Sequence, residues 1–175
     1  NLSYVISDKE RLIRPELAGG ALLDVGIYCL NFALMHFGKD IDHIDSSVQM
    51  TETGVDGQET ITIFYKDGRM ASLYSGIYSR TDRRGMIHGD RGYIEVDNIN
   101  NPQVIRVYNT GDECIQTINA PAQINGYEYE LIEAMNQVQA GEVESVSMPL
   151  DETIECLEIM DGIRAKWNMV YPMEL

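Results

Sequence analysis

The residues best placed for chemistry lie in one short apolar segment near the start of the chain. Asp24, Tyr28 and Asn31 are spaced i, i+4 and i+7, so a helix would carry all three on one face. A carboxylate on an apolar helix is costly to bury unless it is paired or faces a wet cavity. A tyrosine hydroxyl beside it could exchange a proton with a ligand. The alternative is a hydrogen-bonded core, in which Asp24 caps a neighbouring turn and Tyr28 is a core aromatic.

Glycines precede and interrupt the same segment. Gly19, Gly20 and Gly26 would each let a ligand or another backbone approach closely. The string Gly19-Gly20-x-x-x-Asp24-x-x-x-Tyr28 resembles the central motif of the Gfo/Idh/MocA oxidoreductase family, the glucose–fructose oxidoreductase and inositol dehydrogenase group. In that family the last position is His, or Tyr in the branch that includes glucose–fructose oxidoreductase and dihydrodiol dehydrogenase.

Two later segments resemble the same family. Gly126–Glu130 opens a helix, and residues 151–175, with Tyr171-Pro172 near their end, resemble the closing segment of the family. The resemblance spans nearly all 175 residues but covers only the C-terminal domain, which is glyceraldehyde-3-phosphate dehydrogenase-like. It implies a two-domain NAD(P)-dependent oxidoreductase that acts on a sugar, polyol or related small hydroxy or carbonyl compound by hydride transfer.

The resemblance also implies roles for individual residues. Tyr28 is the implied general acid/base, and Asp24 would orient the substrate or the acid/base group. An ordinary tyrosine has a pKa of about 10, so Tyr28 needs a nearby cation to act as a base at neutral pH. In the family that cation is a lysine of the N-terminal domain. Five further residues are expected to bind substrate, the third of them from helical spacing alone: Gly19, Gly20, Asn31, Tyr78 and Arg80.

The sequence contains no dinucleotide-binding signature. No Gly-x-Gly-x-x-Gly occurs, and the glycines of the motif have the wrong spacing for a phosphate-cradling turn. NAD or NADP would therefore be bound mainly by an N-terminal Rossmann domain that is absent from this chain. The start at Asn1, without Met, favours a fragment or a processed product. We expect the isolated chain to be inactive. The alternative is a non-catalytic small-molecule-binding or assembly module of the same fold.

The elements that must position these residues form an α+β pattern. We expect an open, predominantly antiparallel sheet with helices packed on one face. Helices are predicted at 21–37, 127–140 and 151–168, with Asp151 as a helix N-cap. Strands are predicted at 1–6, 44–49, 60–65, 70–79, 93–96, 104–108 and 114–118, with a loop at 7–17 and turns at 67–68 and 88–92. The two later helices should bury apolar stripes of Leu131, Ile132, Met135 and Val138, and of Ile154, Leu157, Met160, Ile163 and Trp167.

Composition narrows the function classes. A chain of 175 residues favours one domain, 1–175, with its own core. Its 13 Lys+Arg against 28 Asp+Glu give a net charge of −15, which argues against nucleic-acid and anionic-membrane partners. The longest uncharged run, Val25–Gly38, is shorter than the roughly 20 apolar residues of a membrane span.

Three other features concern ligands and partners. Cys29, Cys114 and Cys156 are far apart in the sequence, and neither they nor the three histidines show the spacing of metal ligands. Free thiols and the lack of a signal peptide favour a cytoplasmic protein. Ser79–Arg84 is locally basic and would either contact substrate or cofactor phosphate, or pair with surplus carboxylates. Apolar and aromatic residues on both faces of the central hairpin suggest a homo-oligomer through the open sheet face.

Overall fold

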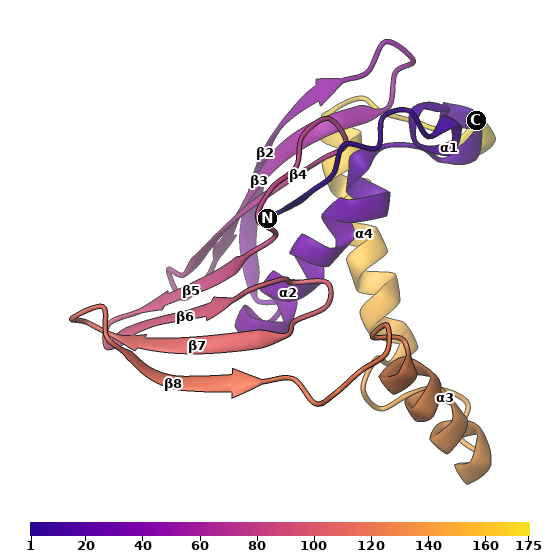
Figure 1. The fold of residues 1–175 in the computed structure, drawn as a ribbon. Coiled ribbons are helices and arrows are strands. Elements are labelled where there is room, and N and C mark those ends of the chain that lie inside the picture. The colour runs from indigo at the N-terminus through magenta and orange to yellow at the C-terminus, as the bar shows by residue number, and fades with distance from the viewer.

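Two four-stranded sheets form the framework of the protein in a computed structural model that describes residues 1–175 (Figure 1). The strand orders are β1-β4-β3-β2 and β5-β6-β7-β8, and all neighbours are antiparallel except β1 with β4. The strands are β1 (Leu2–Ser3), β2 (Ile41–Met50), β3 (Asp56–Tyr65), β4 (Met70–Gly76), β5 (Gly85–Gly89), β6 (Gly92–Val96), β7 (Val104–Asn109) and β8 (Cys114–Asn119). The predicted α+β fold with mostly antiparallel strands is confirmed, with the strands divided between two sheets.

The helical elements lie largely on one side of the first sheet (Figure 1). They are α1 (Glu10–Ile13), the 3₁₀ turn η1 (Pro15–Leu17), the π-helical turn η2 (Leu22–Gly26), α2 (Ile27–Phe37), α3 (Glu128–Ala140), α4 (Leu150–Lys166) and the 3₁₀ turn η3 (Pro172–Glu174). The predicted helix 21–37 is therefore present, but its first turn is π-helical.

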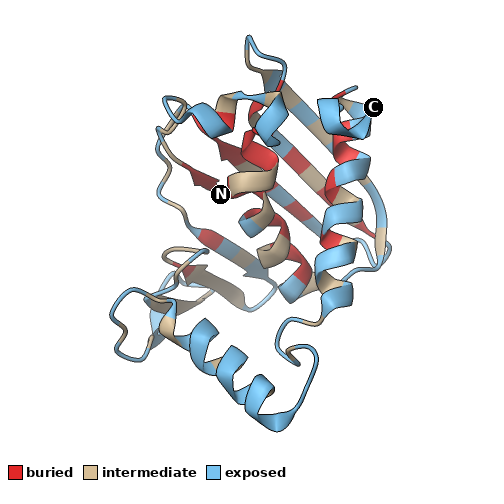
Figure 2. Ribbon diagram, turned by 90° about the vertical axis from the view of Figure 1, so that its right-hand side faces the viewer, coloured by how far each residue is buried: buried red, intermediate tan, exposed pale blue.

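The core lies between the first sheet and the helices η2–α2 and α4 (Figure 2). Alternate residues of β3 point into it, so that Ile61, Ile63 and Tyr65 are buried. From the helices, Leu22, Leu30 and the C-terminal part of α4 complete the cluster. This alternation is the period of two that a strand with one buried face requires.

Several predicted boundaries are wrong for local reasons. The segment predicted as a loop at 7–17 contains α1 and η1, both too short for a periodic signal. The predicted turn at 88–92 shrinks to Asp90-Arg91, because His88 and Gly89 already pair with Tyr93 and Gly92. In α4 the N-cap is Pro149 and not Asp151, and the Leu150 amide donates to the Glu144 carboxylate at 2.8 Å.

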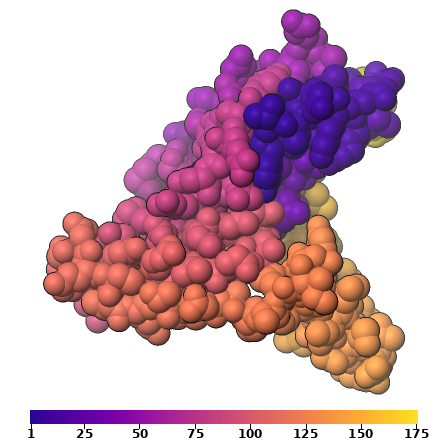
Figure 3. All heavy atoms as spheres, in the orientation of Figure 1, coloured from indigo at the N-terminus to yellow at the C-terminus, as the bar shows by residue number.

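The predicted apolar stripes are mostly exposed in this chain. Met160 and Ile163 of α4 are in the core, but the earlier part of that stripe and the whole stripe of α3 are exposed. Figure 3 shows the α3 region, in orange, projecting from the rest of the molecule. Helical periodicity correctly identified the two helices, while burial of their apolar faces requires a surface that these 175 residues do not supply.

One helical stretch, Pro15–Phe37, is long and apolar enough to cross a membrane by length and composition alone. However, 56% of its most apolar window is buried inside the fold. It covers the first sheet, as the core helix of a folded domain does (Figure 2).

The start of this central helix is fixed by a close approach to β3. The backbone of Gly20 has a φ of +121°, which residues other than glycine rarely adopt. A Cβ atom at this position would also collide with Oδ1 of Asp56. The second glycine of the sequence motif is thus required by the backbone and by its buried neighbour.

We predict that Gly20→Ala destabilises the protein by about 2 kcal/mol or more, because it combines backbone strain with a clash. The matched control is Gly162→Ala, an exposed position inside α4 where an added Cβ meets nothing within 4 Å. Because alanine favours helix over glycine, the control should stabilise by up to about 1 kcal/mol. Urea unfolding measures both, and equal effects of the two substitutions would contradict the prediction.

Candidate functional site

A pocket of about 300 Å³ brings Asp24 and Tyr28 together at the N-terminal end of the central helix. Asp24 lies in η2 and Tyr28 in the first turn of α2, so their side chains follow one another on the same side of the helix. Tyr28 is 44% exposed, which leaves its hydroxyl accessible to a ligand. The pocket is lined by Leu2, Tyr4, Ile6, Lys9, Arg11, Asp24, Val25, Tyr28 and Asn100.

Arg11 holds the Asp24 carboxylate. Its Nη1 donates to Oδ1 of Asp24 at 2.6 Å, with Asp24 24% and Arg11 56% exposed. A partly exposed ion pair of this kind adds at most about 1 kcal/mol to stability, so its main effect is to orient the carboxylate. Arg11 belongs to α1, in the segment that the sequence analysis assigned to a loop, and no spacing signal connects it with Asp24.

Tyr28 is a phenol that keeps its proton at neutral pH. Burial raises the pKa of Tyr28 above its ordinary value of 10, and the negative or phenolic neighbours Tyr127, Asp24, Tyr4 and Glu130 raise it further. The surroundings within this chain therefore suit a proton donor. A base at this position requires a cation that reaches Tyr28 from elsewhere.

The start of α3 is near enough to Tyr28 to influence its ionisation. Tyr127 and Glu130 both act on its ionisation, although they follow it by about a hundred residues. The start of α3 is held by Glu128, whose carboxylate accepts the amides of Asn125 and Gly126 at 3.3 and 2.8 Å. Figure 3 shows a broad recess between the indigo N-terminal segment and the orange α3 region. The sequence marked this segment only as part of the family resemblance.

The two motif glycines pack against protein atoms. A Cβ on Gly19 would lie 2.8 Å from the backbone of Arg11 and Leu12, and Gly20 abuts Asp56. The carbonyl of Gly19 accepts the Tyr171 hydroxyl at 2.6 Å. This places the C-terminal Tyr-Pro segment directly against the motif.

None of the five expected substrate-binding residues lines this pocket, neither the two motif glycines nor the remaining three. Asn31 lies further along α2 and is partly buried. The Tyr78 ring covers Gly57, where a Cβ would fall within 2.8 Å of its hydroxyl. Arg80 is exposed and makes no ion pair.

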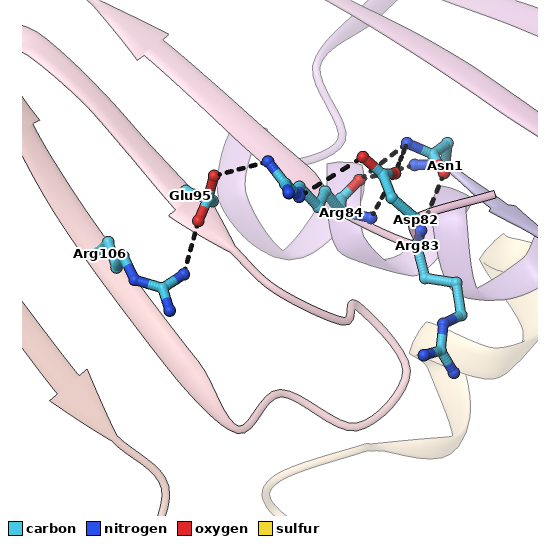
Figure 4. Close-up of polar contacts among 6 residues, drawn as sticks. All are labelled: Asn1, Asp82, Arg83, Arg84, Glu95 and Arg106. Carbon is cyan, nitrogen blue, oxygen red and sulfur yellow. Dashed lines mark hydrogen bonds and ion pairs between the residues drawn. The ribbon is translucent and has the colours of Figure 1, made fainter. Parts of the chain in front are cut away.

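In the basic segment Ser79–Arg84 the structure shows pairing with carboxylates for Arg84. Arg84 pairs with Asp82 and with Glu95, which also accepts from Arg106 at 2.7 Å (Figure 4). Arg83 has no carboxylate partner, and its guanidinium points away from the acidic residues drawn in Figure 4. That guanidinium lies 5.9 Å from the centre of the Tyr4 ring.

A larger cavity of about 470 Å³ lies between α2, β4 and β5 and has a mainly apolar lining. It contains none of the expected site residues. In the 175 residues no group of three or more His, Cys, Asp or Glu is arranged to hold a metal ion. Cys29 and Cys156 are buried free thiols, and Cys114 is an exposed one.

The chain does not fit the phosphates of a dinucleotide at the start of its central helix. Phosphates bind free backbone amides at a helix N-terminus. Here the Leu22 amide already donates to the buried Asp56 carboxylate at 2.5 Å. A second anion at this point would meet the negative charge of Asp56, and the Leu22 amide would not be available to it.

Comparison with known proteins agrees with this arrangement. The sequence profile described as the GFO/IDH/MocA C-terminal domain matches residues 3–95. The chain is 28% identical over 162 residues to scyllo-inositol 2-dehydrogenase (NADP(+)) IolU of Bacillus subtilis, covering 92% of this chain and 48% of that protein. It is 30% identical over 172 residues to trans-1,2-dihydrobenzene-1,2-diol dehydrogenase of Danio rerio, covering 94% of this chain and 51% of that protein.

Solved structures show the same fold. The aldose-aldose oxidoreductase of Caulobacter crescentus, complexed with glycerol, superposes with a TM-score of 0.79 at 21% identity, over 94% of this chain and 50% of that one. The 3-ketoreductase KijD10 of Actinomadura kijaniata, in complex with NADP and TDP-benzene, gives 0.67 at 19% identity, over 81% and 45%. The chain thus spans about half the length of the curated relatives it matches. The motif around Asp24 and Tyr28, the fold and the matching profile together establish that the chain belongs to the GFO/IDH/MocA oxidoreductase family, as its C-terminal domain.

Proposed function

We propose that residues 1–175 form the substrate-binding and oligomerisation domain of an NAD(P)-dependent oxidoreductase that acts on a sugar, polyol or related small hydroxy or carbonyl compound. The observation that carries this proposal is the pocket shared by the Tyr28 hydroxyl and the Asp24 carboxylate. The printed names of the relatives support the substrate class, since they are an inositol dehydrogenase, a dihydrodiol dehydrogenase and an aldose oxidoreductase.

Tyr28 is the proposed acid/base. In the reducing direction its protonated hydroxyl donates a proton to the carbonyl oxygen of the substrate. In the oxidising direction the phenolate accepts the proton of the substrate hydroxyl, which requires a cation nearby because the pKa of Tyr28 is raised by its burial. Asp24, held by Arg11, accepts a hydrogen bond from the substrate or from the acid/base group. The dinucleotide supplies the hydride acceptor or donor when it is bound.

The dinucleotide itself is proposed to bind mainly to another domain of the complete protein. Two observations support this: the Asp56 carboxylate occupies the start of the central helix, and the chain covers about half of its relatives. Isothermal calorimetry of the 175-residue chain should therefore show no tight binding of NAD(H) or NADP(H). Micromolar affinity in the isolated chain would contradict this assignment.

A homo-oligomer in the cytoplasm is the proposed form of the complete protein. The second sheet supports it, because all six residues of β8 are exposed and include Ile115 and Ile118, at 63% and 46%. The three free cysteines support a reducing compartment. A strictly monomeric mass of the complete protein in light scattering at micromolar concentration would count against the oligomer.

We predict that Tyr28→Phe in the complete protein lowers kcat on the order of 10²–10⁴-fold, because the ring remains and only the proton-carrying hydroxyl is lost. The assay follows nicotinamide absorbance with a panel of sugars and polyols. The control is Tyr108→Phe, whose ring stacks on Tyr93 at 4.7 Å in the second sheet, away from the pocket. Unchanged kcat in Tyr28→Phe would remove the catalytic assignment and favour a binding or assembly module.

A second prediction concerns the ionisation of Tyr28 in the 175-residue chain. Because burial and acidic neighbours favour the neutral phenol, Tyr28 should lose its proton only above pH 10. Carbon NMR of labelled tyrosine ring carbons measures this titration, and the signal absent from Tyr28→Phe identifies the residue. A titration midpoint below 10 would show that a cation of this chain already activates Tyr28.

A further inference from the structure

We propose that Glu59 is a neutral acid in the folded protein and shares its proton with the Asp56 carboxylate. The pair holds the N-terminal end of the helix that carries Asp24 and Tyr28. Asp56 and Glu59 are therefore positioning residues. Their protonation follows from the fold alone, whereas their effect on turnover rests on the function proposed above.

Both carboxyl groups lie inside the protein. Asp56 is 0% and Glu59 2% exposed, although the two residues are three apart on β3 and an unbroken strand would turn them to opposite faces. The β2–β3 register shifts here, since Met50 pairs with Asp56 and Gln49 pairs with Gln58. This bulge adds one residue to β3 and turns Asp56 to the same face as Glu59.

Each carboxyl group has one satisfied and one unsatisfied oxygen. Oδ2 of Asp56 accepts the Leu22 amide at 2.5 Å, and Oε1 of Glu59 accepts the Ser75 hydroxyl. The remaining oxygens, Oδ1 of Asp56 and Oε2 of Glu59, are buried without any partner. Neither group forms an ion pair with a lysine or an arginine. Two unpaired anions side by side in a dry interior are not tenable.

One proton resolves both unsatisfied oxygens. A protonated Oε2 of Glu59 donates to Oδ1 of Asp56, and every oxygen of the pair is then hydrogen-bonded. Burial raises the pKa of Asp56 as well, but this group also accepts backbone amides at the positive end of a helix, which favours its charged form and leaves the proton on Glu59. Burial, and then the neighbouring Asp56 charge, raise the pKa of Glu59 well above its ordinary value.

The glycines of the motif segment fit closely around this pair. A Cβ on Gly20 would collide with Oδ1 of Asp56. A Cβ on Gly26 would lie 3.0 Å from both Oε1 of Glu59 and the Ser75 hydroxyl. Both ends of the π-helical turn that carries Asp24 therefore rest on the two carboxyl groups, and moving either carboxyl group moves the turn.

The other titratable groups around the pair supply neither a proton nor a positive charge. Cys29, on α2, donates its thiol to the carbonyl of Tyr74, and burial raises its pKa. Tyr171, on the C-terminal segment, faces Asp56 but donates to the Gly19 carbonyl. Arg164 of α4 lies behind the Tyr171 ring, 4.6 Å from its centre, and is neutralised by Asp161 and Glu174.

The shared proton makes the stability of the helix start depend on pH. Glu59 has a raised pKa in the folded state against 4.5 when unfolded. Its contribution to stability is therefore complete below 4.5 and declines as the pH rises toward the folded-state value. Ionisation of Glu59 would leave two adjacent buried anions and push Asp56 away from the Leu22 amide.

Infrared spectra of the substrate-free complete protein at pH 7, taken as the difference between wild type and variant, test whether Glu59 is protonated. We expect the carbonyl band of a buried neutral carboxylic acid in the wild type and its loss in Glu59→Gln. The control Glu158→Gln changes an exposed residue of α4 and should keep the band. Absence of the band in the wild type, or its persistence in Glu59→Gln, overturns the proposal whatever the enzyme activity.

Kinetics of the same variants test the positioning role. Glu59→Gln keeps a donor toward Asp56 and an acceptor for Ser75, so turnover should be retained and the alkaline loss of stability should flatten. Asp56→Asn removes the charge at the helix start and should lower kcat/KM on the order of tenfold to a hundredfold. Faster amide hydrogen exchange of residues 22–27 in Asp56→Asn should accompany this loss. Exchange and activity like wild type in Asp56→Asn would overturn the positioning role and leave the Tyr28 assignment intact.

Discussion

The buried carboxylate of Asp56 at the start of the central helix is the constraint on which the rest of the site depends. Its Oδ2 accepts the Leu22 amide, and its Oδ1 occupies the space that a side chain at residue 20 would need. A β-bulge is required to turn it inward, and a glycine at position 57 accommodates the Tyr78 ring there. The direction of the helix, and so of the Asp24 and Tyr28 side chains, follows from this contact.

The contact between Asp56 and the Leu22 amide also disfavours phosphate binding at the start of the central helix. A helix N-terminus in an α/β enzyme is a favourable place for a phosphate. Here that position is filled by a carboxylate of the protein itself, and Tyr28, the proposed acid/base, follows in the first turn of α2. Segments far apart in the sequence then act on this site, since Arg11 holds Asp24 and the start of α3 raises the pKa of Tyr28. The result is an accessible phenol whose pKa is raised by burial and by its neighbours.

The sequence predicted the central helix from its apolar length and terminal glycine, and the 60–65 and 70–79 hairpin from β-branched and aromatic residues around the turn at 67–68. The motif residues came from their spacing together with the family resemblance. Arg11 could not be predicted, since α1 is only four residues long and its pairing with Asp24 is tertiary. Asp56 and Glu59 were missed because acidic residues beside a strand are ordinarily solvated, and a bulge leaves no clear signal in one sequence. The exposed stripe of α3 shows the limit of amphipathic patterns: they indicate that a face needs covering, and not by what.

Because Tyr28 is accessible, its pKa depends on what lies over the pocket. An apolar group placed over Tyr28 would remove water from the phenol and raise its pKa further. A cation placed there would lower it. These 175 residues already bias Tyr28 toward its protonated form through burial and through Tyr127, Asp24, Tyr4 and Glu130. The domain therefore holds Tyr28 as a neutral phenol, and under the proposed function a cation brought to the pocket is what would let the same hydroxyl act as a base.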